Sequence, residues 1–511
     1  MKLYKHILLG ITLFTTIYGQ NENKAQIVKK PLELSILAMQ NGKVFNEEWS
    51  IFQEAFKDTN VKLKSYSSKN ISDEIQAFNL AISSGKLPDI ITLAYPQKLE
   101  SLGMDGGLIP LNDLINEHAP NIKKFFEKYP KYKKAAKAAD GNIYFMPSYY
   151  DWYEMKVSQA LFIRKDWLDK LNLKTPETMK DFYNVMKAFK TQDPNGNGKA
   201  DEVPYFERVI EFADKELLGL FGAEFGFYLD GDMIKYGPTS ERFKEAMPEV
   251  IKWYKEGLID QEIFTRGFQG RDYMLRNDLG GITFDWITST SAYNVDTELK
   301  KQNKDFEFVA VTPPEYKGGR FVPDARYFST GGWGISATTK NSVEIIKYFD
   351  YWFSEKGNEL FNWGVEGNTF VRDENGKKMF TDKVMKNKDK SPMQVLLDEG
   401  IQFNRVGAQQ DYEYEKALGN PQSIEWAEKY MKEGYVVDPM PTLKYLPKES
   451  RKIQKINSQL GMVVGEMSQK WILGAEDFEK TYPQFIKRLN DMGLQEALEI
   501  NQKAYDRFNK D

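Results

Sequence analysis

One loop in the middle of the chain has the spacing of oxygen ligands that a calcium ion requires. The sequence DPNGNGKADE, which begins at Asp193, places side-chain oxygens at loop positions one, three, five and nine, with a glycine at position six. Hard cations such as Ca²⁺ take several oxygen ligands around a sharp turn. We therefore expect a structural calcium site with these ligands: Asp193, Asn195, Asn197, the backbone carbonyl of Lys199, Asp201 and Glu202.

The loop departs from the EF-hand pattern at its twelfth position. An EF-hand has a bidentate glutamate there, whereas this chain has Pro204. We assign the missing carboxylate to the nearby Glu202. The alternative is an ordinary polar turn, because Asn and Gly are common in turns without any ion.

Residues for covalent chemistry are scarce in this chain. It contains no cysteine, which excludes disulfides, thiolate nucleophiles and thiolate metal sites. Its histidines are His6 and His118, too few for a multi-histidine metal site, and a Ser-His-Asp triad would depend on His118. Any covalent chemistry would therefore have to come from carboxylates, tyrosines, lysines or arginines.

The elements that position these residues alternate between strand and helix. In the N-terminal part, residues 32–36 and 61–63 have the period of strands, and Phe45–Phe56 has the period of a helix. A second helix over 71–82 ends at Gly85, and a third strand begins at Pro88. This order predicts an α/β fold with a largely parallel sheet, whose ligands bind beyond the carboxyl ends of the strands.

The second half of the chain mixes helices with shorter strand-like runs. We expect helices over residues 165–171 and 176–189, and strands over residues 281–284 and 306–311. The sequence has no internal repeat and no low-complexity linker.

The N-terminus has the features of an export signal. Lys2 and Lys5 precede an apolar stretch from Ile7 to Ile17 that is too short to span a bilayer, and we expect cleavage before Gln20. Residues 1–19 are therefore expected to be a signal peptide, and the mature protein is mildly acidic, which argues against a nucleic-acid partner. Without a cysteine after the signal there is no lipid anchor, unless Tyr18 replaces a native one.

Six short segments, in a fixed order along the chain, carry a resemblance to a known family. They are SGKLPDIIT from Ser84, GGLIPLN from Gly106, DGNIYFMP from Asp140, LFIRKDW from Leu161, FDW from Phe284 and TGGWGIS from Thr330. Together they resemble the extracellular solute-binding proteins of carbohydrate ABC importers, a family that includes maltodextrin-binding and alginate-binding proteins. The resemblance covers nearly the whole mature chain. A loop very similar to residues 193–202 occurs in the alginate-binding proteins, where it is structural.

The resemblance implies two α/β lobes that close on a ligand and then present a surface to a membrane permease. The first lobe would hold residues 30–148 and 329–375, and the second lobe residues 149–328 and 376–511. The partners implied are an oligosaccharide and the transmembrane subunits of an ABC permease. We expect a monomer in the periplasm or cell envelope.

Aromatic residues with polar neighbours are the candidates for sugar contacts, because pyranose rings bind to flat apolar faces and planar polar groups. Aromatic residues make up 14% of the chain. Trp286 matches the family position where a tryptophan commonly stacks on the sugar. The aromatic and acidic candidates are Tyr149, Tyr150, Trp152, Asp285, Trp286, Trp333, Trp363, Tyr412 and Glu413. Core packing is the alternative for Trp333 and Trp363, and a solvated helix face is the alternative for Tyr412 and Glu413.

A uronate ligand would need a cation, and arginine binds carboxylates with two parallel hydrogen bonds. Arg208 and Arg326 lie near the expected cleft, with Arg405 as a weaker candidate. The resemblance to alginate-binding proteins favours uronate-containing disaccharides from alginate or, slightly preferred, from glycosaminoglycans. A neutral oligosaccharide remains open.

Two other classes of protein compete with a sugar receptor. A secreted polysaccharide-degrading enzyme, either a hydrolase or a lyase, would need two carboxylates about 5–10 Å apart or a catalytic base, and nothing in the sequence singles out such a group. A receptor for a peptide or a metal could share the fold, although the aromatic clusters favour sugar.

Overall fold

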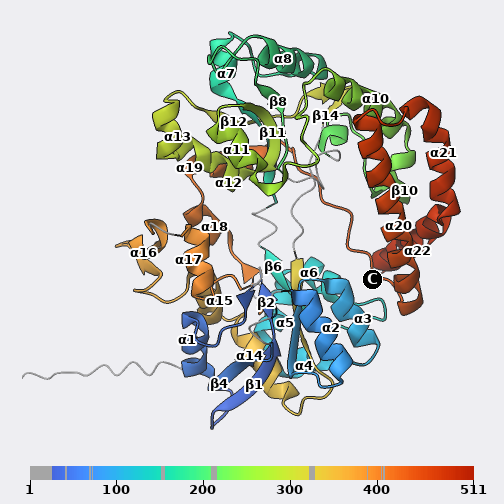
Figure 1. Ribbon diagram of the computed structural model, residues 1–511. Helices are drawn as coiled ribbons and strands as arrows, with labels where there is room; N and C mark the ends of the chain where they lie inside the picture. The colour runs from blue at the N-terminus through green and yellow to red at the C-terminus, as the bar shows by residue number, and fades with distance from the viewer. Residues whose placement is uncertain are drawn as a thin grey trace, which may run out of the picture.

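The protein has two α/β lobes, each built on its own sheet (Figure 1). The computed structural model describes residues 26–510, except for residues 41–42, 68–70, 72, 151–155, 209–215, 321–328, 388–389, 404 and 407–408. Within these residues, no helix combines the length and the apolar character needed to cross a bilayer. The expected two-lobed architecture is confirmed, whereas the expected signal peptide lies outside the described residues.

The first lobe contains a six-stranded sheet in the order β18-β6-β15-β5-β1-β4. Neighbouring strands are parallel except around β15, which is antiparallel to both β5 and β6. The largely parallel sheet expected from the alternation of strands and helices is therefore present, with β15 reversed. The strands are β1 (Leu32–Leu37), β4 (Val61–Ser65), β5 (Ile90–Leu93), β6 (Met146–Tyr150), β15 (Ser329–Ile335) and β18 (Gln409–Gln410).

Helices cover both faces of this sheet, and two small two-stranded sheets flank it. The helices are α1 (Ser50–Thr59), α2 (Glu74–Ser84), α3 (Pro96–Met104), α4 (Asn112–His118), α5 (Pro120–Lys128), α6 (Pro130–Ala136), α14 (Ser342–Tyr351), α15 (Glu355–Trp363), α16 (Asp382–Met385), α17 (Pro392–Asp398) and α18 (Tyr412–Leu418). The small sheets pair β2 (Met39–Gln40) with β3 (Lys43–Val44), and β16 (Phe370–Arg372) with β17 (Lys378–Phe380). Helix α2 ends at Gly85 as predicted, because glycine adopts the left-handed φ of 65° found there.

The second lobe contains a four-stranded sheet in the order β12-β7-β11-β8. Strand β11 is parallel to β8 and antiparallel to β7, so both β8 and β11 carry their following loops to the same edge. The strands are β7 (Gln159–Arg164), β8 (Val203–Tyr205), β11 (Gly280–Trp286) and β12 (Phe308–Val311). Two further hairpins are β9 (Phe227–Asp230) with β10 (Met233–Tyr236), and β13 (Glu315–Tyr316) with β14 (Gly319–Arg320).

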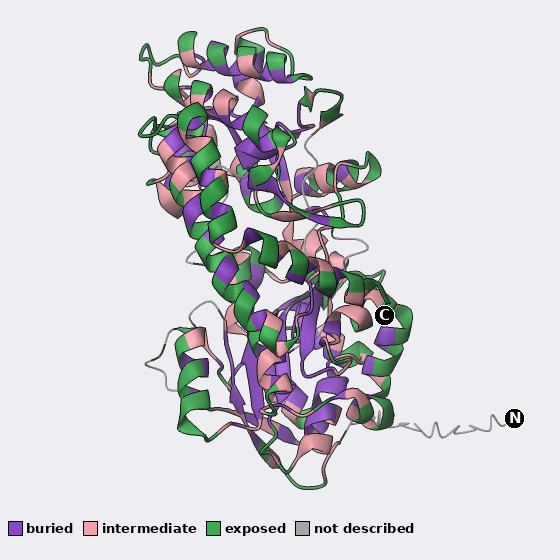
Figure 2. Ribbon diagram, turned by 90° about the vertical axis from the view of Figure 1, so that its right-hand side faces the viewer, coloured by how far each residue is buried: buried purple, intermediate pink, exposed green. Residues whose placement is uncertain are grey.

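Helices surround this second sheet, and the C-terminal helices lie along one side of it in Figure 1. They are α7 (Lys165–Lys170), α8 (Met179–Thr191), α10 (Glu241–Lys255), α11 (Gly270–Arg276), α12 (Ile287–Ser291), α13 (Thr297–Gln302), α19 (Pro421–Lys432), α20 (Pro447–Ile472), α21 (Phe478–Asp491) and α22 (Leu494–Lys510). Buried residues are concentrated in the strands and on the inward faces of the helices (Figure 2).

Residues 378–418 pack with the first lobe, although we expected the second lobe to begin again at residue 376. Strand β18 pairs with β6 in the first sheet, and Phe380, Leu396 and Tyr414 are buried in the same core as the first strands. The apolar residues of these short helices recur at helical spacing, and this spacing would be the same if the helices packed against the second lobe. The choice between the two lobes depends on tertiary packing.

The connection from α19 to α20 touches the first lobe on its way between two helices of the second. Lys444, which is 7% exposed, places Nζ 3.2 Å from Oε2 of Glu100 in α3. Asp438 accepts hydrogen bonds from Lys131 in α6 and from Lys156, both at 3.2 Å. This connection therefore contributes ion pairs between the lobes.

Candidate functional site

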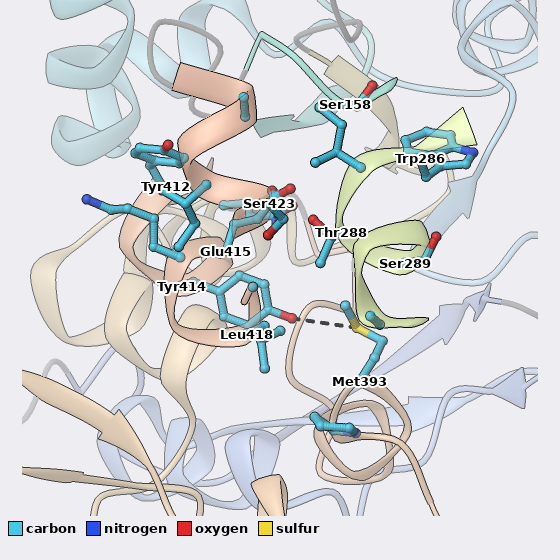
Figure 3. A pocket seen from close by; sticks show the side chains of 18 of the residues that line it. Ser158, Trp286, Thr288, Ser289, Met393, Tyr412, Tyr414, Glu415, Leu418 and Ser423 are labelled. Atoms are coloured by element: carbon cyan, nitrogen blue, oxygen red, sulfur yellow. Dashed lines mark hydrogen bonds between the residues drawn. The ribbon is translucent and has the colours of Figure 1, made fainter. Parts of the chain in front are cut away.

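A cavity of about 790 Å³ lies between the two lobes. Its first-lobe wall comes from α17, β18 and α18, and its second-lobe wall comes from the end of β11, from α12 and from α19 (Figure 3). A volume of this size is in the range of roughly 300–1,000 Å³ typical of small-ligand sites. The cavity is therefore the candidate functional site.

The second-lobe wall combines an exposed indole with hydroxyl groups. Trp286 ends β11 and is 40% exposed, which is unusual for a tryptophan at the end of a buried strand. Thr288 and Ser289 follow it in α12, and Ser158 precedes β7. Figure 3 shows Trp286, Thr288, Ser289 and Ser158 on the same side of the cavity.

The first-lobe wall is formed mainly by α18. This helix begins at Asp411, whose side chain accepts a hydrogen bond from the backbone N–H of Tyr414 at 2.7 Å. The cap fixes the first turn, from which Tyr412 and Glu415 line the cavity opposite Trp286 (Figure 3). The side chains of Gln402 and Gln410 complete this wall.

Asp285 lies directly behind Trp286 and binds two arginines. Arg208 donates from Nε to Oδ1 of Asp285 at 2.9 Å, and Arg271 donates from Nη1 to Oδ2 at 2.9 Å. The backbone N–H of Trp286 also donates to Oδ1, at 2.7 Å. Asp285 is 3% exposed. It therefore holds the indole and the arginines in place and does not line the cavity, so its expected role as a sugar contact is corrected to a positioning role.

Arg271 also anchors α12, which lines the cavity. Its Nη1 lies 2.9 Å from Oγ of Ser289 and 2.8 Å from Oγ1 of Thr290. Beneath this cluster, burial raises the pKa of Glu207 well above its usual range.

Three of the expected sugar contacts are core residues. Trp333 is fully buried and stacks on Phe349 with ring centroids 3.6 Å apart. Tyr149 stacks on Tyr132 at 4.8 Å, and Trp363 is 2% exposed. Glycines on either side of Trp333 let β15 lie close to β5 and β6, and this close approach directs the indole into the core. The expectation of cleft contacts for these three rings is therefore wrong.

The remaining expected residues fall into three groups. Trp286 and Tyr412 line the cavity, as expected. Glu413 does not line it and is paired with Lys416, whereas Arg405 is 8% exposed and binds Glu74 inside the first lobe. Arg208 binds Asp285 and does not line the cavity. Trp152 and Arg326 lie outside the described residues, as does the side chain of Tyr150.

Several lining residues were missed from the sequence. These residues include Ser158, Thr288, Ser289, Met393, Gln402, Gln410, Glu415 and Lys416. A usable signal was present for α12, because the run of hydroxyl residues from Thr288 to Ser291 directly follows Trp286. No local signal marks Gln402 or Met393, which reach the cavity only through the packing of α17 and its neighbours.

The loop from Asp193 to Glu202 joins α8 to β8 in the second lobe and turns sharply at two glycines. Gly196 and Gly198 adopt positive φ values of 73° and 74°. The side chain of Asp193 accepts a hydrogen bond from the N–H of Gly198 at 3.0 Å, and that of Asn197 accepts one from Lys199 at 2.7 Å. These bonds hold the loop in a series of tight turns.

Glu202 is the residue of this loop whose environment fits a cation best. It is fully buried, and neither of its carboxylate oxygens accepts a well-aligned hydrogen bond from the described residues. Burial raises the pKa of Glu202, and the nearby charges of Asp193 and Asp201 raise it further. An unpaired buried carboxylate is costly, and a bound cation would remove that cost.

Other features of the loop fit a cation less closely. The described residues contain no group of three or more His, Cys, Asp or Glu side chains arranged as a metal cage. The amide nitrogens of Asn195 and Asn197 both face Asp201, at 3.2 and 3.1 Å from its Oδ1. The two amides would therefore need to turn their oxygens inward to complete a coordination shell.

The geometry of the interlobe cavity suits binding more than catalysis. Among the described residues that line it, Glu415 is the one carboxylate, so the carboxylate pair of a glycoside hydrolase is not formed there. An exposed indole and phenol on opposite walls, with hydroxyls and amides between them, provide flat faces and hydrogen-bonding groups for a small polar ligand. The fold and the site together define a two-lobed binding protein.

Comparisons with known proteins agree with this class. The curated fructooligosaccharide ABC transporter substrate-binding protein FusA of Streptococcus pneumoniae is 27% identical over 471 residues, which cover 86% of this chain and 83% of FusA. The crystal structure of the alginate-binding protein AlgQ2 without calcium ion has a TM-score of 0.81 and 36% identity, and covers 95% of this chain and 100% of AlgQ2. The structure of FusA in complex with kestose has a TM-score of 0.71 and 25% identity, and covers 94% of this chain and 99% of that one.

Residues 39–359 match the profile of the bacterial extracellular solute-binding proteins, and the chain belongs to this family. The resemblance stated from the sequence is thereby confirmed. Members of this family are receptors, so the expectation that the chain is not an enzyme is confirmed as well.

Proposed function

We propose that this protein captures a uronate-containing oligosaccharide between its lobes and delivers it to an ABC permease. The observation that carries the proposal is the exposed Trp286, which faces Tyr412 and a set of hydroxyl and amide groups across a cavity of about 790 Å³. Aromatic faces on both walls suit the C–H faces of pyranose rings, and the hydroxyls and amides suit the ring hydroxyls.

The acidic character of the ligand is supported by one of the relatives. The name of AlgQ2 gives alginate, a polyuronate, as the ligand of the relative with 36% identity. The name of FusA gives fructooligosaccharides, which are neutral, so a neutral oligosaccharide is the alternative ligand. Disaccharides from alginate and from glycosaminoglycans are the acidic candidates.

Titration calorimetry with a panel of disaccharides tests this proposal. The panel contains dimannuronate, digalacturonate, unsaturated chondroitin disaccharide, mannobiose and kestose. We expect stoichiometric binding of at least one acidic member and no change in its mass after incubation. Trp286→Ala is expected to weaken binding by about tenfold or more while leaving the melting temperature unchanged, because the indole is 40% exposed. Absence of binding by the whole panel would refute the proposal.

The two lobes are proposed to act as the moving units. The first unit holds the expected residues 30–148 and 329–375, to which sheet and core membership adds Tyr149, Tyr150 and residues 376–418. The second unit holds residues 151–328 and 419–510. Closure around the ligand would bring both lobe surfaces to the permease. Small-angle scattering is expected to show a smaller radius of gyration with bound ligand than without it.

We propose that the loop from Asp193 to Glu202 holds a structural Ca²⁺. Its proposed ligands are Asp193, Asn195, Asn197, the carbonyl of Lys199, Asp201 and Glu202, and the buried carboxylate of Glu202 is the main support. The ion would supply positive charge to a buried acidic turn and fix the path from α8 to β8. A protein without cysteine that belongs to an extracellular family fits a periplasmic monomer without a lipid anchor, and we propose that location.

A further inference from the structure

The charged residues of the interlobe cavity are few and lie on α18. Among the described residues that line the cavity, the cation is Lys416 and the anion is Glu415. Both lie on the first-lobe wall, and α18 also carries Tyr412 one turn before Lys416. Among the described residues that line this cavity, Lys416 is therefore the cation available to a carboxylate on a ligand.

Other arginines near the cavity are already bound to carboxylates. Arg208 and Arg271 both donate to Asp285, which is 3% exposed. Arg405 donates to Glu74 at 2.8 Å inside the first lobe. Releasing one of these arginines would take a hydrogen-bonded cation away from Asp285 or from Glu74, which is unfavourable for carboxylates that are buried or half-buried. These three arginines are poor sites for a ligand carboxylate.

Lys416 is held by a partner that is easily exchanged. Its Nζ lies 2.5 Å from Oε1 of Glu413, and the side chain of Glu413 is 67% exposed to solvent. Ion pairs between exposed side chains contribute little to stability, so separating this one costs little. The same Nζ lies 4.7 Å from the centroid of the Tyr412 ring, which lines the cavity. Lys416 is thus a cation next to an aromatic ring of the cavity, and it is paired with an exposed carboxylate that water can replace.

We infer that Lys416 is the residue that selects an acidic sugar, and that the ligand's carboxylate takes the place of Glu413 on it. The inference rests on the proposed function. The uronate carboxylate binds Lys416 at the Tyr412 end of the cavity, and the carboxylate of Glu415 accepts hydrogen bonds from sugar hydroxyls. Lys416 and Glu415, which are neighbours on α18, thereby fix the orientation in which an acidic disaccharide binds. Glu413, an expected sugar contact, becomes a competitor of the ligand.

The experiment compares each acidic disaccharide with its carboxyl-reduced form, which has the same ring stereochemistry. Titration calorimetry is run with dimannuronate against mannobiose, and with digalacturonate and unsaturated chondroitin disaccharide against their reduced forms. The proteins are the wild type, Lys416→Met, Lys416→Arg, Glu413→Gln and the control Lys429→Met. Lys429 is an exposed lysine of α19 that does not line the cavity. All variants change exposed or half-exposed positions, and thermal melts check that they fold.

We expect the wild type to prefer the acidic form by about tenfold, which corresponds to about 1.4 kcal/mol. Lys416→Met removes this preference and leaves the affinity for the reduced form within about twofold, whereas Lys416→Arg and Lys429→Met keep the preference. Glu413→Gln raises the affinity for the acidic form by about threefold, because the competing carboxylate is gone.

Three outcomes overturn the inference. If the wild type binds a disaccharide and its reduced form equally, sugar binding stands and the selection by charge is refuted. If Lys416→Met keeps the preference for the acidic form, the cation lies elsewhere and Lys416 is excluded. If no disaccharide of either form binds, the proposed function fails and the inference fails with it.

Discussion

Replacing Asp285 with asparagine should both destabilise the second lobe and weaken sugar binding. The carboxylate accepts hydrogen bonds from Arg208 and Arg271 at 2.9 Å and from the backbone of Trp286 at 2.7 Å, and the residue is 3% exposed. Asparagine keeps the shape of the side chain but removes its charge, which leaves two arginines facing each other across a neutral amide.

The size of the effect follows from the burial of the three partners. Removing one member of a buried ion pair costs about 3–5 kcal/mol. Arg208 and Arg271 keep 19% and 11% exposure, so water offsets part of the loss, and we expect the lower end of about 3 kcal/mol. For the second lobe, which has about 270 residues, this corresponds to a melting temperature lower by about 5 °C. Binding should weaken by about tenfold because Arg271, which also holds Ser289 and Thr290 of α12, loses its charged partner.

Calorimetric melts and sugar titrations of four proteins check this reasoning. Asp272→Asn is the matched control, since Asp272 is 46% exposed in its pair with Arg276, and we expect a loss of less than about 1 kcal/mol. In the double variant Asp285→Asn with Arg208→Met, one of the two unpaired cations is gone, so part of the stability should return. A melting temperature for Asp285→Asn within about 2 °C of wild type, with unchanged affinity, would refute the assigned positioning role.

Three further predictions concern other buried charges. Chelation of calcium should lower the melting temperature of the wild type but not that of Glu202→Gln, since this variant lacks the buried carboxylate that needs the ion. Equal melting temperatures of the wild type with and without chelator would contradict this prediction. Burial raises the pKa of Asp350 from 3.8 to about 6. The stability that its protonated carboxyl contributes is therefore full below pH 3.8 and is lost as the pH rises through 6, a decrease of about 3 kcal/mol in the free energy of unfolding. The difference in unfolding free energy between wild type and Asp350→Asn, measured from pH 4 to 7.5, should follow this curve, and a flat difference would exclude it. Lys444→Met should lower the free energy of unfolding by about 3 kcal/mol, because it leaves Glu100, which is 5% exposed, without its cation. In denaturant unfolding, adding Glu100→Gln should recover part of that loss, and strictly additive losses would argue against the ion pair.

The polar loops and the exposed indole could be found without the fold because their signals are local. The loop from Asp193 to Glu202 has its oxygens and glycines at fixed spacings, and those spacings produce the turn wherever the loop sits. Trp286 was found through a short matching segment. The alternation of strands and helices also fixed the α/β class, since the period of apolar residues reports which face of each element is buried.

The sequence by itself determined the family, the α/β elements and the polar turn before β8. Only the tertiary structure decided which aromatic rings reach the cavity. Trp333 and Trp286 both lie in strands, but Trp333 packs on Phe349 in the core whereas Trp286 is 40% exposed. It also assigned residues 378–418 to the first lobe and brought α18 opposite Trp286. The physical reason is that burial and the pairing of charges depend on contacts between residues far apart in the chain, and no local pattern encodes which distant surface an element will meet.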